Sequence, residues 1–210
     1  LTSLNLSPVA QLIELGCAEN QMQSLDVGML TDLKVLNCGY NQLTVLDVSA
    51  LDLTSLGFSY NQIAGIDLSM QNNLESLDIS NNPMNVIDVS NMPLIKFLAC
   101  VGNHLTALNI SHLTQLEMLS CSNNELTNLN LPITTLPINL SCQNNLFTSL
   151  DISAAKVSYF DVSANPNLTY VNMKNGYPNT LDAYSCPNLS YVCVDDFELP
   201  SLPFQLIFTD

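Results

Sequence analysis

One position returns every 20 or 21 residues along this chain, and eight times out of nine it holds asparagine. We call it the anchor. The anchors are Asn20, Asn41, Asn61, Asn82, Asn103, Asn124, Asn145, Asn165 and, in the ninth unit, Cys186. A fixed period of this length means that one small structural unit is repeated, and such units are stable only when they stack on one another. The period therefore predicts an elongated array of similar coils.

Apolar residues stand at fixed distances before each anchor. Five residues before it comes Leu in eight units and Phe160 in the other, and three residues before it comes Cys in five units. Those cysteines are Cys17, Cys38, Cys100, Cys121 and Cys142. Apolar residues two positions apart are typical of a short strand with one face turned inward. An Asn that turns the chain inside such a core can bind backbone groups of neighbouring coils through its amide.

The unit reads L-x-x-L-x-C-x-x-N-x-L-T-x-L-D-V-S, which resembles the leucine-rich repeat at the short end of its length range. We therefore expect a leucine-rich-repeat solenoid with a parallel β-sheet on the concave face. The convex side should hold short extended or 3-10 segments, because 21 residues leave no room for a full helix. Residues 1–194 are expected to form about nine units. Residues 195–210 should cap the core, using apolar side chains at Phe197, Leu199, Leu202, Phe204, Leu206 and Ile207.

Several segments resemble the secreted or cell-surface leucine-rich-repeat proteins of Bacteroidetes, and more loosely the internalin-type repeats. They are the L-T-x-L-D-V-S stretches, the Cys column, the Asn-Pro-Asn-Leu turn at 165–168, the insert at 174–176 and the Cys-Val-Asp-Asp run at 193–196. The resemblance implies an extracellular or cell-surface protein that binds a protein or glycan ligand. The alternative is a structural spacer or adhesin segment of a larger surface protein, without a ligand of its own.

Charge narrows the range of partners. The chain has 19 Asp and Glu against four Lys and Arg, for a net charge of −15. Nucleic acids would be repelled, because their affinity for proteins depends on basic side chains that neutralise phosphates. No apolar run approaches the roughly 20 residues that span a bilayer, so membrane insertion is not expected. The chain opens inside a repeat, which predicts a piece of a longer protein, and we expect that piece to be monomeric.

The sequence predicts neither an enzyme nor a cofactor or metal site. The Cys column lacks the close C-x-x-C pairs of metal sites, and small apolar thiols in a core explain it. His104 and His112 lie in no catalytic motif. A column of Asp residues could accept local turn hydrogen bonds or bind Ca²⁺; its members are Asp26, Asp47, Asp67, Asp88 and Asp151. A disulfide between Cys186 and Cys193 also stays open.

Ligand-binding residues are expected where the outward side of the strands departs from its small, polar pattern. The predicted concave-face residues are Phe97, Val101 and Met118, which form an apolar group, and Tyr159, Asp161, Asp182 and Tyr184, which combine aromatic rings with carboxylates. Tyr40 and Tyr60 should stack at the rim, one repeat apart. Exposed aromatic side chains are enriched in protein interfaces.

Overall fold

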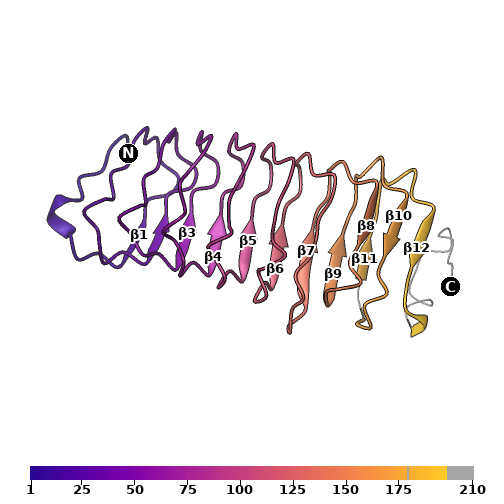
Figure 1. Ribbon diagram of the computed structural model, residues 1–210. Coiled ribbons are helices and arrows are strands. Elements are labelled where there is room, and N and C mark those ends of the chain that lie inside the picture. The colour runs from indigo at the N-terminus through magenta and orange to yellow at the C-terminus, as the bar shows by residue number, and fades with distance from the viewer. Residues whose placement is uncertain (179, 198–210) are drawn as a thin grey trace.

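The structure, a computed structural model, describes residues 1–178 and 180–197. The chain winds in successive coils along one axis, with the N-terminal coil at one end and the C-terminal coil at the other (Figure 1). Each 20- or 21-residue unit forms one coil, as the period predicts. Residues 198–210, most of the predicted capping segment, lie outside the described residues.

Nine short strands form one parallel sheet along the whole length of the coil. In sheet order they are β1 (Glu14–Gly16), β2 (Val35–Asn37), β3 (Ser55–Gly57), β4 (Ser76–Asp78), β5 (Phe97–Ala99), β6 (Met118–Ser120), β7 (Ile138–Ser141), β9 (Val157–Asp161) and β11 (Thr180–Asp182). Equivalent residues of successive units are paired, so that Leu15 faces Leu36 and Leu36 faces Leu56. The predicted sheet is thereby confirmed, and we call its outward side the concave face.

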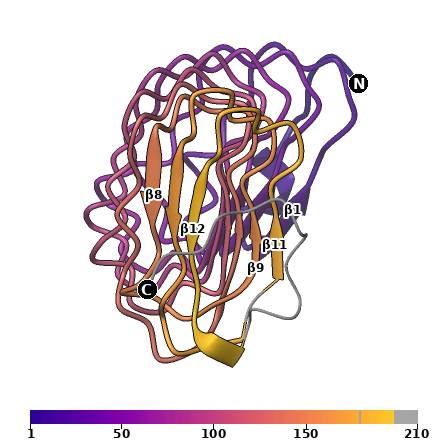
Figure 2. The same cartoon turned by 90° about the vertical axis from the view of Figure 1, so that its right-hand side faces the viewer.

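The opposite side of each coil consists mainly of turns and bends, and η1 (Ser7–Val9) is a 3-10 helix in the first coil. Three units add a strand there: β8 (Ser149–Asp151), β10 (Tyr170–Asn172) and β12 (Tyr191–Cys193), which form a second parallel sheet in the order β12-β10-β8. Seen along the axis, β8 and β12 lie on one side of the coil, while β9 and β11 lie on the other (Figure 2). In the described residues no helix is long and apolar enough to cross a membrane.

The core runs continuously between these two sides. Its largest fully buried side chains are Phe58, Phe147 and Phe160, and the leucines of every unit pack around them. The five cysteines of the column are buried as well, which confirms their structural role. One coil alone would leave this apolar strip exposed to water, so the packing of each coil on the next supplies the stability.

The anchor asparagines form a ladder of hydrogen bonds inside the coil. In one rung the Asn124 amide Nδ2 donates to the carbonyls of Cys100, Cys121 and Ser122 at 2.9, 3.1 and 3.2 Å. Its Oδ1 accepts the backbone N–H of Leu105 at 3.0 Å. From Asn41 to Asn165 each anchor amide donates to backbone carbonyls in its own and the preceding coil, as expected.

The residue just before each anchor has a left-handed backbone conformation. Its φ lies between 51° and 58° in eight units and reaches 66° at Gly102. The nine residues of this left-handed column are Glu19, Tyr40, Tyr60, Asn81, Gly102, Asn123, Asn144, Ala164 and Ser185. The sharp turn brings the chain from the strand into the core at the anchor. A bulky side chain in this conformation is uncommon, which singles out the two tyrosines.

Candidate functional site on the concave face

In most of its strands the sheet buries the middle residue and turns the neighbouring residues outward. In β1 and β5 the middle residues Leu15 and Leu98 are buried, while Glu14 and Phe97 are exposed. Parallel pairing then aligns equivalent outward residues of successive units in columns. Most of these residues are small or polar, so the few large ones stand apart from their surroundings.

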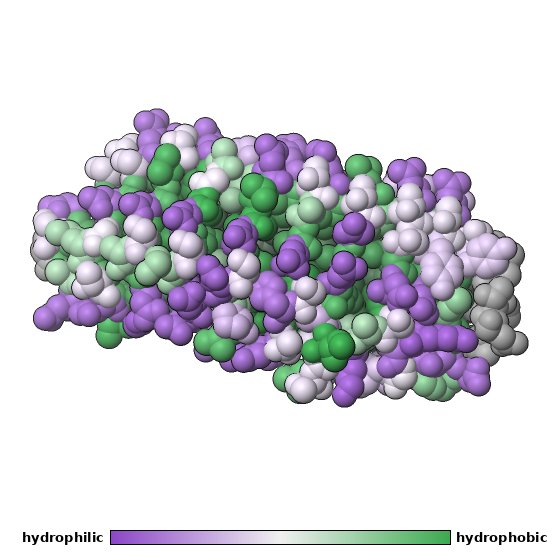
Figure 3. Space-filling view, viewed as in Figure 1, coloured by the Kyte–Doolittle hydropathy of each residue, from purple (hydrophilic) through white to green (hydrophobic). Residues whose placement is uncertain are grey.

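Phe97 and Met118 lie side by side on this face. They are register partners in β5 and β6, and each is 43% exposed. We call them the Phe97–Met118 patch. Val101 lies in the turn after β5 and is half-buried, so it adds less to the exposed apolar surface than the sequence suggested. On the face of the molecule that Figure 3 shows, polar residues are interspersed among the apolar ones.

Tyr159 connects two carboxylates near the C-terminal end of the sheet. Its hydroxyl donates to Asp182 Oδ2 at 2.9 Å and lies 3.3 Å from Asp161 Oδ2. The hydrogen bond to Asp182 is the main reason that the pKa of Tyr159 is raised to about 12. Tyr184 stands nearby and is 75% exposed. The structure thus brings the four residues together, and their role in binding remains a prediction.

A chain of polar contacts extends this cluster toward the middle of the sheet. Ser122 donates to the Gln143 side chain, and the Gln143 amide donates to Asp161. Sequence analysis missed both residues, because a Ser and a Gln on a polar strand face carry no signal of their own. The contacts hold the Asp161 carboxylate in place and leave the second ring, Tyr184, open to solvent.

The two rim tyrosines stack as predicted. The ring centroids of Tyr40 and Tyr60 are 4.3 Å apart and their planes differ by 14°. Both rings stay about half exposed, at 51% and 47%. Partial desolvation is the main cause of a raised pKa at Tyr40, and the neighbouring Tyr60, Glu19 and Asp78 add to it. Both tyrosines belong to the left-handed column, with φ of 54° and 53°.

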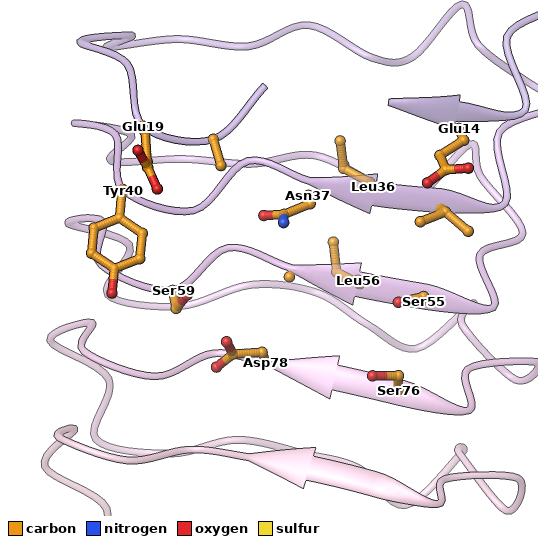
Figure 4. Close-up of a pocket in the computed structure, with 13 residues that line it drawn as sticks. Glu14, Glu19, Leu36, Asn37, Tyr40, Ser55, Leu56, Ser59, Ser76 and Asp78 are labelled. Carbon is orange, nitrogen blue, oxygen red and sulfur yellow. The ribbon is translucent and has the colours of Figure 1, made fainter. Parts of the chain in front are cut away.

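Beside Tyr40 the concave face is hollowed into a groove of about 420 Å³. Figure 4 shows Glu19 and Tyr40 at one end of it, Glu14 at the other, and Asp78 on the strand along its side. We call it the acidic groove. Sequence analysis described the outward side of the strands as small and polar and missed the groove, since a hollow arises where side chains are small and leaves no motif.

The Asp column makes local turn bonds. The Oδ1 atoms of its carboxylates accept the backbone N–H two residues on, at 2.9 to 3.1 Å; the acceptors are Asp26, Asp47, Asp67, Asp88 and Asp151. These bonds confirm the turn alternative. Within residues 1–178 and 180–197 no group of three or more His, Cys, Asp or Glu is arranged to hold a metal ion.

The cysteines and histidines are arranged for structure. All seven cysteines, Cys186 and Cys193 among them, are thiols, and the ladder position of Cys186 places its Sγ 3.3 Å from the Val162 carbonyl. Burial raises the pKa of Cys38 to about 12. His104 Nδ1 lies 3.4 Å from the Glu125 carboxylate, with both side chains largely exposed.

Comparisons with known proteins agree with this geometry. No family model and no curated protein matches the chain. Among solved structures, the functional domain of InlJ from Listeria monocytogenes, described as including a cysteine ladder, is 26% identical with a TM-score of 0.75. It aligns with 99% of this chain, which spans 55% of that domain's length.

Two further solved structures show the fold at lower identity. The leucine-rich repeat domain of APL1B is 20% identical with a TM-score of 0.65, over 98% of this chain and 68% of that one. An internalin, inlF, from Listeria monocytogenes is 16% identical with a TM-score of 0.51, over 99% of this chain and 89% of that one. With the stacked strands and the asparagine ladder, these likenesses establish that the chain folds as a leucine-rich-repeat solenoid of the internalin-like kind.

Proposed function

We propose that this chain is a non-catalytic interaction module that works outside a cell and binds its ligand, a protein or a glycan, through the concave face. The observation that carries the proposal is the Phe97–Met118 patch. Two large apolar side chains, each 43% exposed, stand together among outward residues that are mostly small or polar. Apolar and aromatic side chains at the centre of a rigid face are typical anchors of protein interfaces, so a protein is the favoured ligand.

Other features support the same proposal. Tyr159, Asp161, Asp182 and Tyr184 form a second group with large side chains on the same face. In the sheet order, β11 is four strands away from β5, which carries Phe97. The solenoid is a rigid scaffold whose sheet offers a wide surface. The resemblance of the repeats to secreted and surface proteins of Bacteroidetes, together with the likeness to the InlJ domain, supports an extracellular place of action.

The proposal can be tested by screening the chain against arrays of extracellular proteins and of glycans. The double variant Phe97→Ser, Met118→Ser should lower the affinity for a genuine ligand at least about tenfold, because hot-spot anchors contribute over about 1–2 kcal/mol each. The matched control is Val45→Ser, which removes an apolar side chain of 69% exposure outside the sheet. Thermal unfolding midpoints should be the same for all three proteins.

Two results would contradict the proposal. One is a ligand whose affinity is unchanged by Phe97→Ser, Met118→Ser and by Tyr159→Ser. The other is the failure of both arrays to yield a ligand, which would favour the structural spacer or adhesin segment.

A further inference from the structure

The acidic groove has the size of a ligand site and a floor of small residues. Its volume of about 420 Å³ falls within the range of roughly 300–1,000 Å³ that small-molecule and side-chain pockets occupy. Ser55 on β3 and Ser76 on β4 line it in the column where the next two strands carry Phe97 and Met118, and Gly57 lines it on β3. The hollow is therefore produced by missing side-chain volume on a rigid sheet.

The groove carries negative charge without a compensating base. Its lining contains the carboxylates of Glu14, Glu19 and Asp78 and no Lys, Arg or His. Lys34 comes directly before strand β2, and its ammonium lies 2.7 Å from the Asp52 carboxylate. Neither Lys34 nor Asp52 lines the groove. Carboxylates gathered in a concave site attract cations more strongly than the same charges on a flat surface.

An aromatic ring closes one end of the groove. Tyr60 covers one face of the Tyr40 ring by stacking on it at 4.3 Å. The next residue of the left-handed column on the other side of Tyr40 is Glu19, whose backbone N–H binds the Gly39 carbonyl at 3.0 Å. Tyr40 lines the groove and Tyr60 does not, and Figure 4 places Tyr40 beside Glu19 at one end of the groove. Tyr60 holds that ring in position.

We propose that the acidic groove binds the guanidinium group of an arginine side chain presented by a protein ligand. This inference rests on the proposed function, because it specifies one contact that the protein ligand makes with the concave face. A guanidinium is planar, so it can lie on the open face of Tyr40 and gain a cation–π interaction. Its N–H groups can at the same time donate to the carboxylate of Glu19, which lies at the same end of the groove. A lysine ammonium fits the charge but has no plane to stack.

The test uses the whole chain and the peptide acetyl-Gly-Arg-Gly-amide, followed by NMR chemical shifts. We expect saturable binding with a Kd on the order of 1–10 mM, as a single side chain supplies only a few kcal/mol. The shifts should centre on Tyr40, Gly57 and Ser59. The same peptide with citrulline, which keeps the shape and loses the charge, should bind at least about tenfold more weakly, and the lysine peptide should fall between them.

Two variants and their matched controls locate the contact. Gly57→Leu should abolish binding by filling the groove; an added Cβ there comes no closer than 3.7 Å to another residue, so the fold should tolerate it. Gly65→Leu, at a position with no atom within 4 Å of an added Cβ, is its control. The double variant Glu14→Gln, Glu19→Gln should bind the arginine peptide more weakly, and its affinity should depend less on salt concentration. The control variant Glu125→Gln should leave both the affinity and its salt dependence unchanged.

Three outcomes would overturn the inference: shifts that do not saturate, equal binding of the citrulline peptide, or tighter binding of the neutral disaccharide cellobiose at the same residues. Its failure is separable from that of the proposed function, because the array screen depends on Phe97 and Met118 on other strands. A ligand that needs this patch would stand even if the arginine peptide does not bind. Conversely, binding of the arginine peptide would support the arginine site even if neither array yields a ligand.

Discussion

Asn103 and Asn124 occupy equivalent positions in the ladder and make different sets of hydrogen bonds. Both amides donate to three backbone carbonyls. Asn124 also accepts the Leu105 N–H, whereas the buried Oδ1 of Asn103 has no partner among the described residues. The equivalent donor for Asn103 would be Met84, which follows Pro83. The two rungs therefore offer a natural comparison of one buried hydrogen bond.

We predict that Asn124→Ala destabilises the chain more than Asn103→Ala, by about 1–2 kcal/mol. The extra loss arises because the Leu105 N–H is left buried without an acceptor, and an unpaired buried donor costs about that much. Urea unfolding followed by circular dichroism gives both free energies. Equal losses in the two variants, or a larger one for Asn103→Ala, would show that the acceptor side of the ladder contributes nothing.

A second residue-scale prediction concerns Gly102, where φ is +66° and an added Cβ would lie 2.4 Å from Asn81 Oδ1. Gly102→Ala should destabilise the chain by about 1–2 kcal/mol, combining left-handed strain with this close contact. In the double variant with Asn81→Gly the contact disappears, so part of the loss should be recovered. Ala164 already has φ of 56°, which shows that the conformation itself accepts alanine. A full loss in the double variant would assign the whole effect to the backbone.

At the scale of the element, the Asp turns link stability to pH. Hydrogen bonds from the Ser69 and Ser90 backbone and side chains lower the pKa of Asp67 and of Asp88 below the usual carboxyl value. A lowered pKa in the folded state means that the carboxylate form stabilises the fold. That contribution is complete above the unfolded pKa of about 4 and disappears as the pH falls through the folded value.

We therefore predict that the stability difference between the native chain and Asp67→Asn, Asp88→Asn shrinks as the pH is lowered from 5 to 3. Asparagine keeps the Oδ1 acceptor and removes the charge, so only the pH-dependent part is lost. Urea midpoints at three pH values measure the difference. Asp32→Asn, which removes one carboxylate outside these turns, serves as the control for loss of charge. A difference that stays constant down to pH 3 would exclude the turn carboxylates as the cause.

The sequence could predict a structural element where that element follows from residue types that recur at the same position in every repeat. The columns of Leu, Cys and Asn fixed the register, so the sheet and the positions of Phe97 and Tyr159 could be predicted. The acidic groove could not, because it depends on small residues such as Gly57 whose neighbours leave a hollow.

Gln71 was missed for a related reason. It is fully buried where other units place Leu or Met, and it binds three backbone groups that only the folded coil brings together.

For the whole molecule, the linear array predicts that the coil holding Cys17 opens more readily than inner coils when these 210 residues are studied alone. Each coil contacts only its neighbours, so in that sample the first coil has one packing partner where an inner coil has two. Buried thiols report such opening, because burial strongly raises the pKa of Cys121 and removes its reactive thiolate. Cys17, in the first coil of this chain, is the equivalent thiol near one end.

We predict that under native conditions a thiol reagent modifies Cys17 before Cys38, and Cys38 before Cys100 and Cys121, with at least about a tenfold difference in rate between Cys17 and Cys121. Quenched labelling and peptide mass spectrometry give the individual rates, and the urea-unfolded chain provides the unprotected reference. Uniform rates at all four thiols would mean that the coil opens as a single cooperative body.

The left-handed column has a consequence for how such a molecule could change its specificity. Glu, Tyr, Asn, Gly, Ala and Ser all occupy the same backbone conformation there, and none of them contributes to the packed interior. Apart from the close contact that restricts Gly102, chemical character along that edge is thus separate from the packing of the core. Single substitutions in this column can therefore create a new binding surface while the fold stays the same, both in evolution and in protein engineering.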